Sequence, residues 1–264
     1  MIYEFGELLQ FPASRVHSGN VGRLRNATMS AGSQISPRSE ARVAGAIYVL
    51  VIVFGAYAEL VGRQGLVVAG NPAATLNAIA SHQAQYRLGF MAEMITNMLA
   101  IPSTVIFWRL LRPVNAMVAL IALVFDLTQN TINALNALMQ FAPLSLLPGS
   151  PDVSALPASE LAALAKLALR WHDVGFQIGL TFFSFALLLE GGLVFLSGYF
   201  PRWLGALYVF AGACYLVVAC DYFLDLHIAF VTQIQFGSFV GEAAMALWLL
   251  VVGLDQTKWR ETSH

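Results

Sequence analysis

The sequence predicts an all-α integral membrane protein, a bundle of six transmembrane helices with both termini in the cytoplasm. The composition is the first observation: 58% of the 264 residues are hydrophobic and 11% are charged, whereas a soluble domain carries about 25% charged residues. The second is a set of six apolar segments, each long enough to cross ~30 Å of hydrocarbon as a helix. The third is an unequal distribution of basic residues between the two ends of these segments.

The six apolar segments are too long and too uniformly apolar for the alternating strands of a membrane β-barrel, so helices are expected. Pro113 and Pro201 stand just before two of them, where proline suits the first helical turn. The expected spans are Val43–Val61, Gly89–Leu111, Ala116–Leu138, Val174–Leu196, Leu204–Phe223 and Ile228–Leu250.

The basic residues predict the orientation. With the N-terminus inside, ten of the 14 Lys and Arg residues fall in cytoplasmic segments, and Arg63, Arg87, Lys166 and Arg170 fall outside. Cytoplasmic loops carry such an excess of basic residues. Two outer segments, Ala73–Ser81 and Glu160–Arg170, are expected to be short helices lying on the outer membrane surface.

The chain divides into three regions. Residues 1–35 are polar and are expected to be a disordered N-terminal arm or to lie upstream of the true start. Residues 36–254 hold the six-helix transmembrane domain, and residues 255–264 form a short cytoplasmic tail. The formal net charge of −1 argues against nucleic-acid binding, which needs a basic surface.

Polar residues interrupt the apolar spans at helical spacing, which places them on single faces of their helices. One stripe, at i, i+3, i+4 and i+7, consists of Asp126, Gln129, Asn130 and Asn133. A charge at the centre of a membrane helix costs ~2.5–3.5 kcal/mol, so these faces are expected to line a shared cavity on the outer side. The candidate ligand-binding residues are Arg87, Glu93, Asn97, Asp126, Asn130, Asn133, His172, Asp173, Gln177, Asp221 and Glu242.

Three buried acids carry the most specific prediction. Glu93, Asp126 and Glu242 are expected to point into the same cavity, with Arg87 as their counter-charge. Because acids outnumber bases there, some are expected to be protonated, paired with arginine, or neutralised by a bound cation. The Asn and Gln residues have an alternative role as hydrogen-bonding contacts between helices, worth ~0.6–2 kcal/mol each.

The sequence leaves the function open between three classes. A binding or transport protein, whose cavity takes a proton, a cation, or a small cationic or lipid ligand, needs only the residues present. An intramembrane enzyme that uses carboxylates, with or without a metal, is the second class. The third is a structural or stress-related membrane protein without a ligand. No nucleotide or metallohydrolase motif occurs in the sequence, so no cofactor and no resident metal are expected. The oligomeric state stays open, and the lipid bilayer is the expected partner.

Two helix-opening segments resemble each other. The run from Arg42 to Tyr48 and the run from Arg202 to Tyr208 share Arg, Gly and Tyr at the same spacing. Each is followed by a span carrying a glutamate, Glu93 in one case and Glu242 in the other. Either the two pairs of helices that begin with these segments are related, or the match arises by chance, since repeats of this length are weak evidence.

Residues 36 to about 253 resemble the bacterial membrane family catalogued as domain of unknown function 4386. The motifs that carry the resemblance are Ser36-Pro37-Arg38, Arg42-Val-Ala-Gly45-Ala-Ile-Tyr48, Tyr86-Arg87-Leu-Gly89, Arg112-Pro113, His172 with Gly175 and Gly179, Pro201-Arg202-Trp-Leu-Gly205, and Gly241-Glu242. The resemblance implies a compact multi-pass protein of the bacterial inner membrane with no assigned reaction. It therefore supports the architecture and leaves the function open.

Overall fold

The computed structural model describes residues 36–263 except for residues 148 and 150, so the expected arm at residues 1–35 lies outside the described residues. The described elements are helical, and no strand occurs among them. In chain order they are α2 (Pro37–Tyr57), η1 (Ala58–Gln64), α3 (Pro72–Ser81), α4 (Gln83–Leu111), α5 (Ala116–Ser145), η2 (Pro151–Val153), α6 (Ala158–Leu196), α7 (Arg202–Leu224), α8 (Val231–Val251) and α9 (Gln256–Thr262).

Local sequence sets where several helices begin. Asn115 caps α5, because its side-chain oxygen accepts from the backbone N–H groups of Met117 at 3.1 Å and Val118 at 3.0 Å. Asn71 caps α3 in the same way, and Ser36 caps α2. These caps satisfy backbone donors that a helix start would otherwise leave without partners.

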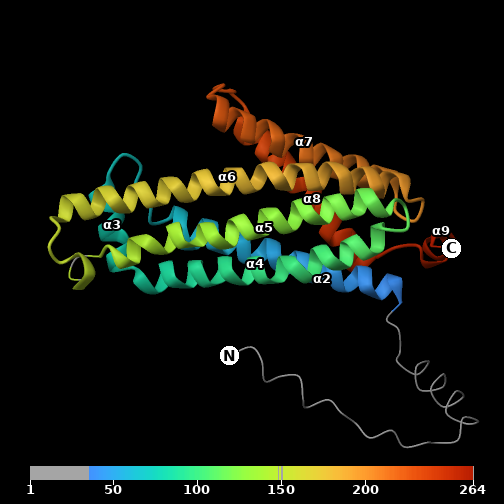
Figure 1. Ribbon diagram of the computed structural model, residues 1–264, viewed down its shortest axis with the longest axis horizontal. Coiled ribbons are helices and arrows are strands. Elements are labelled where there is room, and N and C mark those ends of the chain that lie inside the picture. Colours follow the sequence, from blue (N-terminus) through green and yellow to red (C-terminus); the bar gives the residue numbers. More distant parts are fainter. Residues whose placement is uncertain (1–35, 148, 150, 264) are drawn as a thin grey trace, which may run out of the picture. The chain divides into compact units, whose positions relative to one another are not determined.

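Six helices are long and apolar enough to cross a membrane, with mean hydropathy between 1.4 and 2.0 over their best windows. Figure 1 shows α4, α5 and α6 lying side by side. The contacts between helices close a ring: α2, α4, α5, α6, α7 and α8 each pack on the next, and α8 returns to α2. Large apolar side chains such as Leu50, Leu135 and Leu247 are exposed on the outside of the ring. This is a multi-pass membrane protein, and the predicted six-helix, all-α fold is confirmed.

Glycines allow the helix backbones to touch where they cross. A Cβ added at Gly191 on α6 would lie 2.6 Å from the backbone nitrogen of Val209 on α7. A Cβ added at Gly45 on α2 would lie 2.2 Å from the backbone nitrogen of Leu250 on α8. Small residues at such crossings let membrane helices approach closely, and dispersion contacts then stabilise them. The ring is therefore closed by close backbone packing at α2–α8 and α6–α7.

Two apolar cores lie at opposite ends of the ring. The core at the α3 end contains Leu76, Ile79, Tyr86 and Leu161, and the core at the α9 end contains Leu110, Tyr199 and Leu204 among others. Near the α9 end, Arg42 donates to the carbonyl of Val251 at 3.0 Å. These contacts hold both ends of the bundle, and the polar side chains lie between them.

The outer segment Glu160–Arg170 differs from the prediction. It is the first part of α6, a helix of 39 residues and hence about 58 Å long. No proline or glycine separates it from the expected span at Val174–Leu196, so the helix continues without a break. Its apolar face packs against α3 in the core at the α3 end. The expectation of a separate surface helix is therefore wrong.

Candidate functional site

A cavity of about 250 Å³ lies inside the ring. All six long helices contribute to its wall, which is mostly apolar and aromatic. The polar lining residues are Tyr48, Thr96, Asn97, Ser103, Thr104, Asp126, Gln129, Asn130, Asn133, Glu190, Tyr208, Tyr215 and Glu242. Asp126 lies ten residues from the start of α5, or about 15 Å along the helix, which is the middle of a ~30 Å bilayer core.

Asp126 and Glu190 form a pair of carboxyl groups. Asp126 on α5 is 8% exposed and Glu190 on α6 is 3% exposed. Both line the cavity as neighbours, and the hydroxyl of Thr104 donates to Asp126. Neighbouring carboxyl groups make each other harder to ionise, and an ionised carboxylate at this depth is already costly. At least one of the two is therefore expected to carry a proton.

Glu242 on α8 has a different environment. The Tyr48 hydroxyl donates to one of its oxygens at 2.8 Å, and the Tyr215 hydroxyl donates to the other. The hydroxyls of Tyr48 and Tyr208 lie 3.2 Å apart. Phenol donors on both oxygens stabilise a charged carboxylate. Tyr48 and Tyr208 are the tyrosines of the two similar helix-opening segments, which meet at this acid.

Amide side chains form the wall opposite the tyrosines. Asn130 on α5 donates to the backbone carbonyl of Asn97 on α4 at 3.0 Å. The side-chain nitrogen of Asn97 and the side-chain oxygen of Asn133 are buried and have no hydrogen-bond partner among the described residues. Buried amides are nearly always satisfied. Both residues line the cavity, but these two atoms are themselves enclosed, and the Asn133 oxygen packs against Gly179 on α6.

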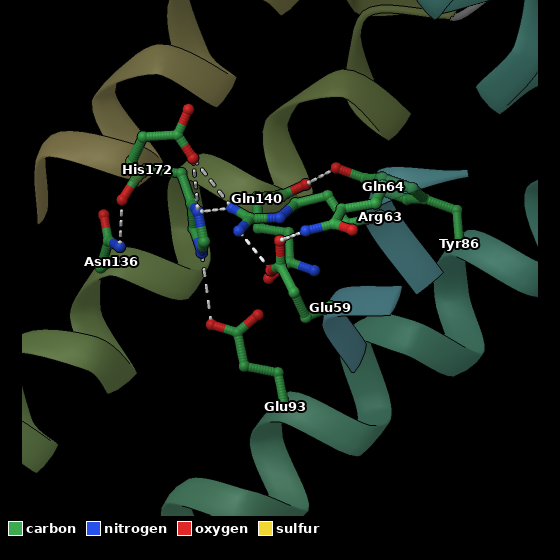
Figure 2. Close-up of polar contacts among 9 residues, drawn as sticks. Glu59, Arg63, Gln64, Tyr86, Glu93, Asn136, Gln140 and His172 are labelled. Atoms are coloured by element: carbon green, nitrogen blue, oxygen red, sulfur yellow. Dashed lines mark hydrogen bonds and ion pairs between the residues drawn. The ribbon is translucent and has the colours of Figure 1, made fainter. Parts of the chain in front are cut away.

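A second polar cluster lies nearer the α3 end, and we call it the cap network: Glu59, Arg63, Glu93, His172 and Asp173. Figure 2 labels the first four of these residues. Arg63 donates to Asp173 at 3.0 Å and also pairs with Glu59. The His172 side chain is only 3% exposed, and its Nε2 lies 3.4 Å from Glu93. The network joins η1, α4 and α6.

The imidazole of His172 lies between Arg63 at Nδ1 and Glu93 at Nε2. A guanidinium only donates, so the contact with Arg63 is a hydrogen bond when Nδ1 carries no proton. In that tautomer Nε2 donates toward Glu93. The backbone carbonyl of His172 accepts from Asn136 at 2.7 Å, which anchors α6 to α5 at this level.

The charge balance differs between the two clusters. The cap network contains three carboxylates with Arg63, whereas no Lys, Arg or His side chain lines the cavity in the part of the chain that the structure describes. Within the same described ranges, no group of three His, Cys, Asp or Glu side chains is placed to hold a metal ion. Among the described residues, no basic side chain in the cavity wall balances the charge of its acids.

The structure divides the predicted site residues into three sets. The cavity lining includes Asn97, Asp126, Asn130, Asn133 and Glu242. The cap network includes Glu93, His172 and Asp173. The three remaining candidates belong to neither: Arg87, Gln177 and Asp221.

These three candidates have other environments. Arg87 is exposed, and the arginine of the cap network is Arg63, which contacts His172 beside Glu93. Gln177 has a buried side-chain oxygen without a partner among the described residues, but it does not line the cavity. Asp221 accepts from the backbone N–H of Ile228 at 2.8 Å and so orders the α7–α8 turn. Asp126 and Glu242 line the same cavity, whereas Glu93 lies in the cap network.

Sequence reasoning missed Glu190 and the three tyrosines. Glu190 lies six residues from the end of α6, so its depth alone gave no reason to group it with the outer acids. Tyrosine hydroxyls give no spacing signal in an apolar helix. The match between the segment that ends at Tyr48 and the segment that ends at Tyr208 was the one pattern that included two of these tyrosines.

Comparison with known proteins identifies the family. The sequence profile described as "Domain of unknown function (DUF4386)" matches residues 43–253. The chain belongs to this family. An uncharacterized protein of Archaeoglobus fulgidus is 36% identical over 98 residues, which are 35% of this chain and 58% of that protein. The matched part thus spans under two thirds of that relative. No solved structure matches the chain significantly.

Several of the residues behind the DUF4386 resemblance have structural roles here. Arg42 and Gly45 close the ring against α8. Gly205 touches the backbone of Gly191 on α6. Gly241 packs on α7 and precedes Glu242, which lines the cavity. The DUF4386 motifs in this chain therefore lie both at helix crossings and at the site.

Proposed function

We propose that the protein binds a small cation in the cavity, in exchange with protons held by the buried acids. The observation that carries the proposal is the wall itself: Asp126, Glu190 and Glu242 line one cavity without a basic side chain among the described residues. An ionised carboxylate at this depth costs ~2.5–3.5 kcal/mol. The cost falls when an exchangeable proton or cation offsets part of the acids' charge.

The hydrogen bonds suggest separate roles for the acids. Glu242, which receives two tyrosine hydroxyls, is the acid that binds the cation. Asp126 and Glu190 share a proton and release or take it up as the cation enters or leaves. Such coupling lets one monovalent cation replace one proton and leaves the net charge of the cavity unchanged.

The cap network covers the α3 end of the bundle in this proposal. With the termini inside, as the basic residues favour, that end faces outward from a bacterial inner membrane. The row of amides on α4 and α5 then links the cap network to the cavity. Opening the contacts of Arg63 would admit a ligand from outside.

Thermal unfolding of the purified protein tests the proposal. Small cations at fixed ionic strength should raise the unfolding midpoint in a saturable manner, because a ligand that binds only the folded state stabilises it. Asp126→Asn and Glu242→Gln should fold but lose this rise. Glu160→Gln, an exposed acid at the start of α6, is the matched control and should keep it. Equal responses from all three variants would contradict the proposal.

An intramembrane enzyme is the second candidate, because two carboxyl groups that share a proton also suit acid–base catalysis. Elemental analysis of the purified protein and turnover of ester or amide substrates separate the two functions. Stoichiometric metal that leaves only with a chelator, or turnover lost in Asp126→Asn, would favour the enzyme.

A further inference from the structure

We propose that the cavity opens sideways into the half of the bilayer nearer the α3 end, between α2 and α6, and that its cation is the head group of an amphiphile. The ligand class is an ammonium compound with one alkyl chain, whose head lies at Glu242 and whose chain extends toward the lipid. The inference rests on the proposed function and narrows the chemical class of its ligand. It depends on which neighbouring helices stay in contact toward the α3 end.

Three of the contacts between neighbouring helices extend to the α3 end. A Cβ added at Gly62 in η1 would lie 2.5 Å from the backbone of α4. Tyr86 on α4 donates to the backbone carbonyl of Gln140 on α5 at 2.6 Å. A Cβ added at Gly175 on α6 would meet the side chain of Asn136 on α5. The span formed by α2 and η1 and the helices α4, α5 and α6 therefore stay packed in sequence at this level.

The hairpin formed by α7 and α8 leaves the ring before that level. Among the described residues, its outermost ring contact with α6 joins Phe183 and Tyr215 at 5.8 Å, and its outermost hydrogen bond with α2 joins Tyr48 and Glu242 at 2.8 Å. Glu242 stands at the middle of α8. Figure 1 shows the end of α7 that joins α8 rising away from α6. The outer ends of α6 and α7 border a groove of about 560 Å³, lined by side chains of both helices.

The lining of the cavity shows the same asymmetry. Toward the α3 end α5 and α6 supply lining residues such as Asn133 and Phe176, whereas α7 and α8 supply none beyond Tyr215 and Glu242 among the described residues. Gln235 lies seven residues before Glu242, hence on the same face of α8, and it is exposed. The side of the cavity that the hairpin would cover is therefore the side that opens to the lipid.

The charges of the cavity select the head group. Three acids line it, and no Lys, Arg or His side chain does so in the part of the chain that the structure describes. The phosphate of a phospholipid would face these acids without a positive partner, and like charges brought together are costly. A head group with a single positive charge fits instead. Apolar lining residues such as Val51 and Phe176 suit an alkyl chain.

Titrations of the purified full-length protein in phosphatidylcholine nanodiscs test the inference. The solutes are decylamine, ethylamine, decanol and potassium chloride, and the unfolding midpoint is the readout. We expect decylamine to reach half-saturation at a concentration ~10-fold or more below that of ethylamine, because its chain leaves water on binding. Decanol enters the bilayer as well but lacks the charge, so it should give no saturable rise.

Two glutamines of α8 give a matched pair of variants. Gln235→Trp places a large side chain on the open face and should weaken decylamine binding several-fold while ethylamine binding persists. Gln233 is also exposed but lies nine residues before Glu242, on the opposite face of the helix. Gln233→Trp should keep the binding of both amines. Equal effects of the two variants on decylamine binding would overturn the sideways opening.

The other outcomes separate this inference from the proposed function. Ethylamine or potassium binding as tight as decylamine binding, and lost in Glu242→Gln, would overturn the amphiphile while the cation site stands. A saturable rise with decanol equal to that with decylamine would overturn the role of the charged head group. Decylamine binding that persists in Glu242→Gln would overturn both proposals, and so would the absence of a saturable shift with any of the cations.

Discussion

At the scale of single residues, the chemistry of the cavity depends on which hydrogen bonds each acid receives. Glu242 lies between two phenol donors, while Asp126 and Glu190 face each other. Acidic side chains thus serve two roles within one cavity. Neutral donors favour a charged acid, and a second acid favours a shared proton.

Removing one phenol donor from Glu242 should lower the stability of the folded protein. Tyr215→Phe keeps the ring and deletes the hydroxyl that reaches Glu242. We expect the free energy of unfolding to fall by ~1–2 kcal/mol, as for a hydrogen bond to a charged group in a membrane bundle. Unfolding in sodium dodecyl sulfate measures this change. Tyr222→Phe, an exposed tyrosine on α7, is the control, and equal losses in both variants would contradict the assignment.

The two arginines near the α3 end should differ in importance. Arg63 bonds to Glu59, His172 and Asp173, whereas Arg87 is exposed. Arg63→Gln should lower the free energy of unfolding by ~1–2 kcal/mol, because the Arg63 side chain is largely buried while two of its partners are partly solvated. Arg87→Gln should be nearly neutral. The reverse order, measured in the same detergent assay, would support Arg87 as the counter-charge.

Spacing predicted part of the site and could not predict the rest. The stripe through Asp126 and Asn130 was visible because helical periodicity marks a face. Spacing did not predict that Arg63, rather than Arg87, would belong to the cap network. The reason is that the π-helical turn η1 alters which residue of that helix faces α6. Tertiary contacts, which one sequence does not contain, decide such cases.

At the scale of elements, neighbouring glycines on α6 provide a matched test of helix packing. A Cβ at Gly191 would meet the backbone of Val209, while one at Gly192 would meet nothing within 4 Å. Gly191→Ala should destabilise the protein by ~1–3 kcal/mol through overpacking. Gly192→Ala should be neutral or slightly stabilising, since alanine favours helix. If both changes were neutral in the unfolding assay, α6 and α7 would not cross as described.

Hydropathy predicted the six spanning helices well and their extents less well. Long apolar runs specify that a segment crosses the membrane. They do not specify where a helix ends once it leaves the lipid, so the extension of α6 from Val174 back to Ala158 was missed. Packing of Leu161 and Ala165 on α3 stabilises that extension.

At the scale of the whole molecule, the closed ring and the basic residues together predict a topology. An even number of spans places both ends of the six-helix domain on one side, and the excess of Lys and Arg there favours the cytoplasm. Reporter fusions after Val114 and after the C-terminus should therefore be active in the cytoplasm. A fusion at Ser154 should be active on the other side. A C-terminal reporter found outside would contradict this orientation.

The central claim is that the cavity acids exchange a proton for a bound cation, and infrared difference spectroscopy tests it most directly. Adding the cation to the purified protein should remove a protonated-carboxyl signal in the wild type, because the proton shared by Asp126 and Glu190 leaves as the cation binds Glu242. The cation should no longer remove that signal in Asp126→Asn or in Glu242→Gln. A wild-type spectrum without any change in carboxyl protonation, at cation concentrations that saturate binding, would contradict the account.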